Sequence, residues 1–382
     1  MRPNVILCLN SGSSSLKFTL FRFEERLAEG AAERIGLADS RFRVNGVAEQ
    51  RQFSSHQEVV QAILNAPEMR ALPRPEAVGH RVVHGGPDHT DPQPVTRELM
   101  EQLKLLIPLA PLHLPAQIQV MEFVAQAEPS LPQVACFDTA FHRSMPEIAQ
   151  RLPLPRAHWE DGLRRYGFHG LSYEYIVSKL GDALKGATVI AHLGNGASLA
   201  ALRDGKPVDT TMGLTPAGGL MMGTRTGDLD PGVLFFLANE KHYDPGRLAH
   251  LVEEEAGLLG VSGITSDMQR LLEASGSEPN AAQAVEMFCY YASKHIGAMA
   301  AALGGLDLLV FTGGIGEHAA PIRERICSRL GFLGVALDPE QNAIHAEVIS
   351  RAGAPCTVRV IPTDEDLMIA RHVAAIIARN PR

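Results

Sequence analysis

Four side chains in this sequence combine a reactive chemical type with a position that a ligand could reach. Arg81 and Asp138 stand at the ends of apolar runs, and strand ends are where α/β sheets collect ligands. His169 lies between two glycines, and Arg225 lies among Gly and Thr, where it could approach a phosphoryl group. Taken singly, Arg81, Asp138 and His169 are better explained as ordinary surface or turn residues, and a surface salt bridge to Asp228 is the alternative for Arg225. Taken together they suit phosphoryl transfer, in which positioning and charge neutralisation do most of the catalysis.

Two segments, residues 5–16 and 189–199, share one plan of apolar run, small-residue turn and second run. Backbone N–H groups of such Gly, Asn and Ser turns can face an anion, and Lys17 adds a cation after the first turn. Two ordinary hairpins explain the pattern equally well. The alternative is a duplicated domain with two phosphate-facing hairpins.

A third glycine-rich segment, residues 313–319, follows an apolar run and precedes a helical pattern. Its Gly314-x-Gly316-x-x-Ala319 spacing fits the dinucleotide fingerprint, which is a weak signal by itself. The acid that should end a second strand, Asp338, is followed by proline and indicates a helix start instead. We therefore predict a glycine loop near a nucleotide and disfavour an NAD-dependent dehydrogenase. Neither a P-loop nor a G-x-S-x-G motif is present.

Composition bounds the class of protein. The chain has 382 residues, which suggests two domains, and it is 45% hydrophobic and 20% charged, as globular proteins are. The net charge of −8 gives no reason to expect nucleic-acid binding. The longest apolar run, residues 296–306, falls short of the roughly 20 residues that span a membrane. Five cysteines without a C-x-x-C, and no secretory leader pattern, lead us to expect a cytoplasmic protein.

Alternating apolar runs and helical patterns predict an α/β architecture. The principal helices are expected at residues 98–107, 281–303 and 365–378, a domain boundary near 144–165, and a long functional loop at 204–231. Strands are expected at residues 5–9, 16–21, 77–83, 134–137, 187–193, 198–202, 306–312 and 357–361.

Nine ordered motifs spanning nearly the whole chain resemble the acetokinase family of the acetate/sugar kinase, Hsp70 and actin superfamily. They are LNSGSSSLK (9–17), HRVVHGG (80–86), PLAPLH (108–113), FDTAFH (137–142), YGFHG (166–170), HLGNGAS (192–198), GLMMGTRTGDLDP (219–231), FTGGIGE (311–317) and IPTDEDLMIAR (361–371).

The resemblance implies two duplicated RNase H-like domains, of the actin/Hsp70 type, with an interdomain catalytic cleft. Residues 1–143, completed by a C-terminal helix at 366–382, would form the N-terminal domain, and residues 144–365 the nucleotide-binding domain. The implied reaction is reversible, direct in-line transfer of the γ-phosphoryl group of ATP to acetate, giving acetyl phosphate and ADP. It implies Mg²⁺, with Mn²⁺ as a substitute, and a cytoplasmic homodimer with neither nucleic-acid nor membrane partners.

The resemblance also implies roles for individual residues. Asp138, His169, Arg225 and Arg81 would be catalytic, with Arg81 also binding substrate. The apolar pocket for the acetate methyl would be formed by Val83, Leu112, Phe168 and Pro216. The magnesium positions would be Asn10 and Glu365. The nucleotide contacts would be Lys17, His192, Leu193, Gly194, Asn195, Gly196, Asp267, Met268, Gln269, Gly314, Ile315, Gly316, Glu317 and His318.

Departures from the family pattern fall mainly on the nucleotide side. His318 stands where asparagine is usual, and Gln269 stands where arginine is usual, with Arg270 displaced by one. They leave nucleobase preference open. A propionate-preferring kinase of the same family stays an alternative, because one methylene in an apolar pocket is worth only ~1–3 kcal/mol. The alternative of another class is a non-catalytic nucleotide-binding regulator on the same scaffold.

Overall fold

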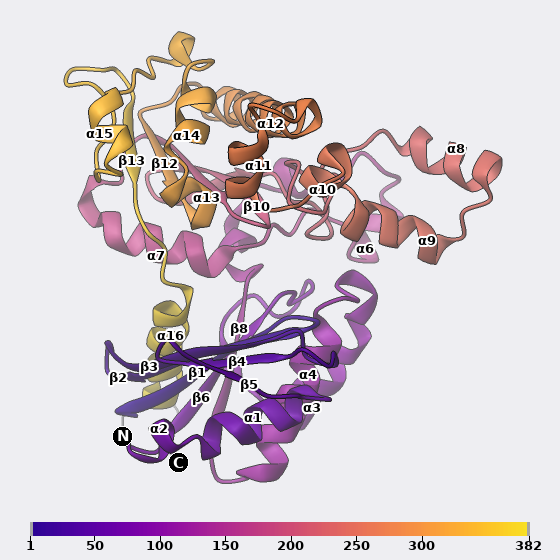
Figure 1. The fold of residues 1–382 in the computed structure, drawn as a ribbon, viewed down its shortest axis with the longest axis vertical. Coiled ribbons are helices and arrows are strands. Elements are labelled where there is room, and N and C mark those ends of the chain that lie inside the picture. The colour runs from indigo at the N-terminus through magenta and orange to yellow at the C-terminus, as the bar shows by residue number, and fades with distance from the viewer. Residues whose placement is uncertain (1–2, 380–382) are drawn as a thin grey trace. The chain divides into compact units, whose positions relative to one another are not determined.

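The computed structural model describes residues 3–379, which form two compact units (Figure 1). Unit 1 comprises the described residues of Met1–Arg143, Gly170–Tyr175 and Asp364–Arg382. Unit 2 comprises Ser144–His169 and Ile176–Thr363. The chain therefore passes between the units four times, and the last passage lies between Thr363 and Asp364.

Unit 1 is built on one eight-stranded sheet in the order β5-β4-β3-β2-β1-β6-β8-β7. β1 and β2 form the predicted hairpin, and β1, β6 and β8 run parallel to one another. The strands are β1 (Val5–Ser11), β2 (Ser15–Arg22), β3 (Glu25–Glu33), β4 (Arg41–Val44), β5 (Val47–Gln50), β6 (Ala77–Val82), β7 (Gln93–Pro94) and β8 (Gln133–Phe137). The helices are α1 (His56–Asn65), α2 (Pro67–Arg70), α3 (Arg97–Leu105), η1 (Ile107–Leu109), α4 (Leu114–Ala127), η2 (Ala140–Ser144) and α16 (Glu365–Arg379).

Successive residues of β1 enter two different cores, as the two-residue period of a strand requires. Leu7 and Leu9 join the cluster beneath α1 and α4, whereas Ile6 and Cys8 join the cluster beneath α16. A Cβ at Gly79 of β6 would lie 2.3 Å from Ile369, so the missing side chain lets α16 pack directly on the sheet. Figure 1 shows this last, yellow helix beside the indigo strands of unit 1.

Unit 2 is built on a five-stranded sheet in the order β11-β10-β9-β12-β13. Its strands are β9 (Ala187–Leu193), β10 (Ala197–Arg203), β11 (Lys206–Thr210), β12 (Leu308–Thr312) and β13 (Thr357–Val360). Its helices are α5 (Glu147–Gln150), α6 (Ala157–Glu160), η3 (Gly181–Ala183), α8 (Pro231–Lys241), α9 (Pro245–His250), the π-helix η4 (Leu251–Glu255), α10 (Gly257–Ser262), α11 (Met268–Ala274), α12 (Pro279–Leu303), α13 (Gly313–His318), α14 (Ala320–Cys327), η5 (Gly331–Leu333) and α15 (Pro339–Ala343). Helix α7 (Gly170–Leu180) begins in unit 1 and ends in unit 2.

The two sheets share one topology. In both, an antiparallel three-stranded meander (β3-β2-β1 or β11-β10-β9) continues into two parallel strands (β6-β8 or β12-β13). The predicted α/β class and the duplicated RNase H-like architecture are therefore confirmed. The predicted cleft between the domains stays a prediction.

The structure corrects two details of the sequence interpretation. Strand β11 lies within residues 204–231, which we expected to be one loop; it is short and only partly buried, so it lacks a clear apolar run. The glycine-rich segment is largely helical, because α13 begins directly after β12. Asp338 does start a helix, since its side chain accepts from the backbone N–H of Glu340 and Gln341.

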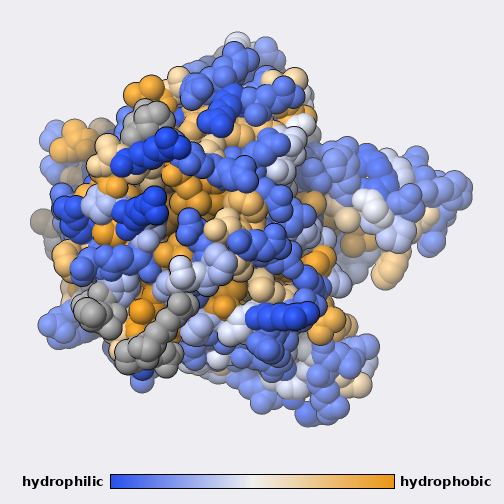
Figure 2. Space-filling model, turned by 90° about the horizontal axis from the view of Figure 1, so that it is seen from below, coloured by the Kyte–Doolittle hydropathy of each residue, from blue (hydrophilic) through white to orange (hydrophobic). Residues whose placement is uncertain are grey.

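The outer surface is mixed. Figure 2 shows one face, on which hydrophilic side chains surround smaller hydrophobic areas, as is common for folded proteins. Within residues 3–379, no helix is long and apolar enough to cross a membrane.

Candidate active site

Arg81 forms a two-pronged ion pair with Asp138. Its Nε donates to Oδ1 at 3.1 Å and its Nη2 donates to Oδ2 at 2.5 Å. The sheet fixes both residues, because β6 pairs with β8 up to Val82 and Phe137, and the Asp138 N–H donates to the Val82 carbonyl. Bidentate pairs of this kind are strong and directional. The sheet register therefore sets the orientation of the guanidinium.

Two further oxygen-bearing side chains reach Arg81 within unit 1. Its Nη1 donates to Asn10 Oδ1 at 3.2 Å, and its Nε lies 3.7 Å from Glu365 Oε2. Burial alone lowers the pKa of Arg81, but Asp138 and Glu365 outweigh that effect and leave the pKa raised. The guanidinium therefore remains charged at neutral pH.

The first turn of α16 holds Glu365 through its neighbours. Asp364 accepts from Arg26 Nη2 at 2.9 Å, and Asp366 Oδ2 accepts from Thr19 Oγ1 at 2.6 Å. These two contacts anchor the start of the helix to β3 and β2. Burial raises the pKa of Asp366. The acidic side chain beside Arg81 is thus carried on a fixed helix end.

In unit 2, two histidines lie ring against ring. His169 and His192 stack with ring centroids 4.2 Å apart, and His169 Nδ1 lies 2.9 Å from the Ser198 hydroxyl. His169 has a φ of 58°, which is uncommon for a residue with a side chain. A non-glycine residue in this region is often found where geometry serves a function.

Arg225 belongs to the same cluster as the two histidines. A Cβ added at Gly196 would lie 3.2 Å from His169 Nε2 and 3.6 Å from Arg225 Nη1, so both side chains meet at this glycine. Arg225 donates to the Pro216 carbonyl at 3.2 Å. Its loop is seated on the β9–β10 turn, because the Gly223 N–H donates to the Asn195 carbonyl at 2.9 Å.

The predicted nucleotide segments at residues 192–196 and 314–318 lie next to each other. Strand β12 pairs with β9 up to Thr312 and His192. A Cβ at Gly313 would lie 2.8 Å from the Leu193 carbonyl oxygen, and Gly194 faces the Gly314 N–H. Both segments therefore leave the same edge of the unit 2 sheet, as ligand-binding segments of α/β sheets do.

The Glu317 carboxylate accepts hydrogen bonds mainly from backbone N–H groups. Its Oε1 accepts from the N–H of Gly313 at 2.8 Å, from the N–H of Thr363 at 3.1 Å and from the Thr312 hydroxyl at 3.4 Å. These bonds connect α13, the glycine helix, to Thr363, which is the last residue of unit 2. Its neighbour His318 is 77% exposed.

Other predicted nucleotide residues have local roles. Asp267 caps α11 by accepting from the Arg270 N–H, Gln269 donates to Glu273, and Met268 is buried. Lys17 lies opposite Asn10 across the β1–β2 hairpin. The side-chain hydrogen bonds of Asp267 and Gln269 thus lie within α11 and its cap.

The four predicted pocket residues are divided between the units. Val83 and Leu112 belong to unit 1, whereas Phe168 and Pro216 belong to unit 2. Val83 and Phe168 are buried, and Leu112 and Pro216 are partly exposed. Their assembly into one acetate pocket stays a prediction.

Three residues that support His169, Val83 and α13 were not identified from the sequence. Ser198 contacts His169, and Gln117 joins the Val83 N–H to the Ser11 carbonyl. Arg323 lies fully buried behind α13. Ser198 stands inside a motif we had singled out, so it could have been found, whereas the other two carry no sequence signal.

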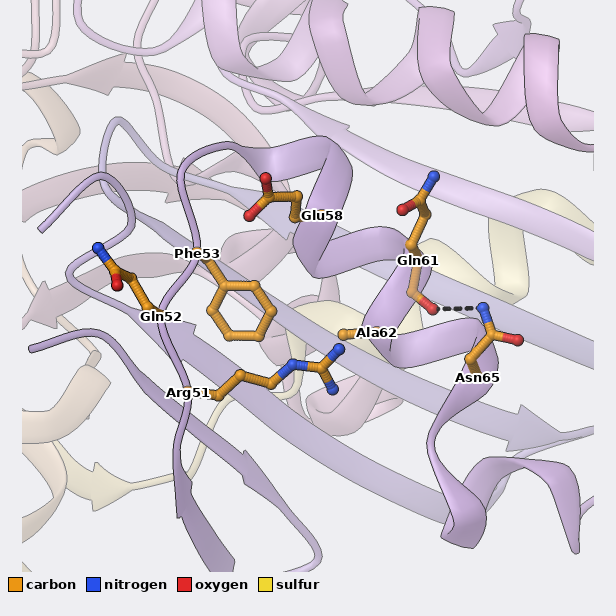
Figure 3. Close-up of a pocket in the computed structure, with 7 residues that line it drawn as sticks. All are labelled: Arg51, Gln52, Phe53, Glu58, Gln61, Ala62 and Asn65. Atoms are coloured by element: carbon orange, nitrogen blue, oxygen red, sulfur yellow. Dashed lines mark hydrogen bonds between the residues drawn. The ribbon is translucent and has the colours of Figure 1, made fainter. Parts of the chain in front are cut away.

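A separate hollow of about 260 Å³ lies on unit 1, between residues 51–53 and the face of α1 that carries Glu58, Gln61, Ala62 and Asn65 (Figure 3). Arg51 lies over the Phe53 ring there, and the Asn65 side chain donates to the Gln61 carbonyl. None of the predicted site residues lines it.

Comparisons with known proteins agree over nearly the whole chain. The model of the Acetokinase family matches residues 5–371. The acetate kinase of Rhodopseudomonas palustris (strain ATCC BAA-98 / CGA009) is 46% identical, over 97% of this chain and 98% of that protein. The crystal structure of Porphyromonas gingivalis acetate kinase is 38% identical with a TM-score of 0.88, over 98% of this chain and 100% of that one. A propionate kinase structure from Francisella tularensis subsp. tularensis SCHU S4 is 36% identical with a TM-score of 0.91, over 97% and 98%. The chain belongs to the acetokinase family.

Proposed function

We propose that this protein transfers the γ-phosphoryl group of ATP to acetate, reversibly, giving acetyl phosphate and ADP. The observation that carries the proposal is the fork of Arg81 on Asp138, with Asn10 and Glu365 around it, in a chain of this family. Acetate is already an anion at neutral pH and needs no base to deprotonate it. The difficulty is to bring an anion to a polyanion, and fixed positive charge removes that difficulty.

The roles we propose follow from this need. Arg81 binds the acetate carboxylate or the transferring phosphoryl group, and Asp138 orients the guanidinium rather than acting as a general base. The bidentate geometry supports an orienting role, because both Asp138 oxygens accept from Arg81. Arg225 and His169 stabilise charge on the transferring group, and their convergence at Gly196 supports this.

The residues around Arg81 suit a magnesium ion. Asn10 and Glu365 offer an amide oxygen and a carboxylate, which are the hard ligands that Mg²⁺ prefers, and Mg²⁺ keeps several waters and substrate oxygens in addition. Among residues 3–379 no cluster of three or more His, Cys, Asp or Glu side chains could hold a metal. We propose that water and substrate phosphates complete the ligands of the ion. When bound, the ion, or Mn²⁺ in its place, would neutralise phosphate charge.

Acetate is the acceptor we propose, and propionate is the second candidate. The high structural similarity to a propionate kinase keeps that candidate open. Val83 is the residue we expect to limit acyl length, with Leu112, Phe168 and Pro216. Val83→Ala should then favour propionate over acetate by about tenfold, since a methylene is worth ~1–3 kcal/mol. An unchanged acetate-to-propionate ratio would remove Val83 from the pocket.

ATP binding is proposed for the adjoining segments at residues 192–196 and 314–318. Lys17 and residues 267–269 are retained as nucleotide contacts on the resemblance alone. Gln269 and exposed His318 leave the base preference to experiment. All five cysteines are buried free thiols, which suits the cytoplasmic location that we propose.

A homodimer is also proposed, and helix α8 supports it. None of its side chains is buried, and Phe235 and Phe236 are 68% and 57% exposed. Figure 1 shows α8 and α9 extending away from the sheet of unit 2. Helices of this length are marginal in water without packing, so a second copy would stabilise α8 by covering it. Phe235→Asp should yield monomers in sedimentation equilibrium, whereas Phe332→Asp, on another exposed phenylalanine, should leave the dimer intact.

The experiment that tests the function traps acyl phosphate with hydroxylamine. Purified protein, ATP and Mg²⁺ would be supplied with acetate, propionate or butyrate, with Arg225→Ala as the control. Product with acetate ahead of propionate, lost in the control, supports the proposal. Product favouring propionate changes the acceptor. No product despite measurable ATP binding would instead support a non-catalytic nucleotide-binding regulator.

A further inference from the structure

Arg323, in α14, is the largest fully buried side chain of the described residues, at 0% exposure. Arginine is almost never buried so completely unless a carboxylate pairs with it. No carboxylate lies within ion-pair distance of this guanidinium in the part of the chain that the structure describes. Burial lowers the pKa of Arg323 to about 10, so the charge persists at neutral pH. Such a costly arrangement is expected where it serves a function.

All five N–H groups of Arg323 are used, and each bonds to an uncharged acceptor. The backbone carbonyls of Gly316 and Glu317 accept from Nη1 at 2.9 and 2.8 Å. Asn342 accepts twice at 2.8 Å, through Oδ1 and its carbonyl, and His345 Nδ1 lies 3.0 Å from Nη2. Because arginine can only donate, the His345 nitrogen must accept, and that imidazole is neutral.

Two of these hydrogen bonds hold the C-terminal end of the glycine-rich helix α13. The carbonyls of Gly316 and Glu317 belong to its last turn, where carbonyl groups have few partners within a helix. A six-residue helix has little stability of its own. The Glu317 carboxylate fixes its first residue, Gly313, and Arg323 fixes its last turn against the segment that carries Asn342 and His345.

We propose that Arg323 is a positioning residue for the nucleotide. It acts through the Gly316 and Glu317 carbonyls, holding α13 in the one conformation that binds ATP, without touching ATP itself. The inference rests on the proposed function, which assigns α13 to the nucleotide. A preformed binding element avoids the ordering cost at the moment of binding. Arg323 therefore contributes to ATP affinity and not to the transfer step.

Two substitutions of Arg323 distinguish the proposed positioning role from an effect of its positive charge alone. Arg323→Lys keeps the positive charge but cannot reproduce five directed donors. We expect it to raise the Kd and KM for ATP about tenfold, which corresponds to ~1.4 kcal/mol. The value of kcat and the KM for acetate should stay within about twofold, because Arg81 and Arg225 are intact. Arg323→Ala should behave likewise, and added guanidinium at about 10 mM, far below denaturing concentrations, should restore much of the ATP affinity.

The matched control is Arg329→Ala. This arginine follows α14, is 40% exposed and pairs with Glu286 on the surface. It should leave the ATP constants unchanged. If neither Arg323 variant folds, His345→Ala removes only one of the five acceptors and should raise the KM for ATP about threefold, in proportion to that smaller loss.

The ATP affinities and kinetic constants of these variants decide whether Arg323 has the proposed positioning role. A folded Arg323→Lys enzyme with normal ATP affinity would overturn the proposal, as would equal losses in kcat and in both KM values. If neither Arg323 variant folds and His345→Ala is tested instead, a normal ATP affinity in that variant would also contradict the proposal. ATP binding would be measured directly by calorimetry, without turnover. Failure of the acyl-phosphate assay would therefore reject the proposed function, while the calorimetric comparison would still decide the role of Arg323.

Discussion

Arg81 and Arg323 are both removed from bulk water, yet their surroundings are opposite. Arg81 has two carboxylates beside it, which leave its pKa raised despite burial. Arg323 has only carbonyl, amide and imidazole acceptors, and burial lowers its pKa. The Arg81 side chain is 18% exposed, whereas Arg323 is fully buried, with 0% exposure. The difference separates a charge presented to a ligand from a charge used to hold backbone.

The comparison shows how one residue type serves two purposes. Carboxylates around Arg81 fix its direction and leave one side open to an incoming anion. Carbonyl, amide and imidazole acceptors around Arg323 occupy all five of its N–H groups, so that none remains for a ligand.

The largest effect is expected at Arg81. Arg81→Met should lower kcat for acetyl phosphate formation by ~10³–10⁵, the range seen when an arginine that stabilises phosphoryl transfer is removed. Arg143→Met is the control, because that arginine pairs with Asp91 on the surface and otherwise donates only to the Thr90 and Ala140 carbonyls. A hydroxylamine-trap rate within tenfold of the unmodified enzyme would show that Arg81 does not act on the transferring group.

Asp138 should come next. Asp138→Asn keeps the shape of the side chain but weakens its hold on Arg81, so we expect a loss of about 100-fold in kcat, or ~2.7 kcal/mol. Steady-state kinetics at saturating ATP would measure it. Near-normal turnover would contradict both the orienting role and any role as a base.

A smaller effect concerns His80, the neighbour of Arg81. Burial lowers the pKa of His80 to about 4, although its bond to Gln133 opposes that shift. The unfolded chain, with an ordinary pKa near 6.5, binds the extra proton first as the pH falls. Stability is therefore full above pH 6.5 and declines as the pH falls toward 4, with a loss of about 2 kcal/mol between pH 7 and pH 5. Urea unfolding at both values would measure it.

A matched variant isolates this contribution. His80→Gln cannot titrate, so the difference in unfolding free energy between pH 7 and pH 5 should shrink by about the same 2 kcal/mol. An unchanged pH dependence in the variant would assign the loss to other groups.

The smallest effect is expected at Glu317, which holds backbone as Arg323 does. Glu317→Ala removes the acceptor of the Gly313 and Thr363 N–H groups and should destabilise by about 1–2 kcal/mol. Glu317→Gln retains an amide oxygen and should recover most of that stability. Thermal unfolding would compare the two, and equal losses would show that the carboxylate charge, rather than the acceptor oxygen, matters.

Long apolar runs made the central strands of both sheets predictable. The small-residue turns likewise identified the two hairpins. Strands β4 and β5 were missed because they are short and β5 is fully exposed, so no apolar run marks them. Helix α8 was missed because its apolar residues follow no single face.

The site was only partly predictable. The special contexts of Arg81, Asp138, His169 and Arg225 were visible in the sequence, but their roles came from the family resemblance. The fork between Arg81 and Asp138 depends on strand register, which no local pattern reveals. Arg323 stands between Ile322 and Glu324, where an arginine would ordinarily point to solvent. Its burial follows from long-range packing against Asn342.

The most direct test compares Arg81→Lys with Arg323→Lys, with ATP affinity measured by calorimetry and kcat by the hydroxylamine trap. We expect each variant to lose the property that the other keeps. Arg81→Lys should bind ATP normally but lose at least ~100-fold in kcat, because lysine lacks the bidentate fork. Arg323→Lys should keep its kcat and lose about tenfold in ATP affinity. The same pattern of loss in both variants would contradict the division between a charge that acts on the substrate and a charge that holds the glycine helix.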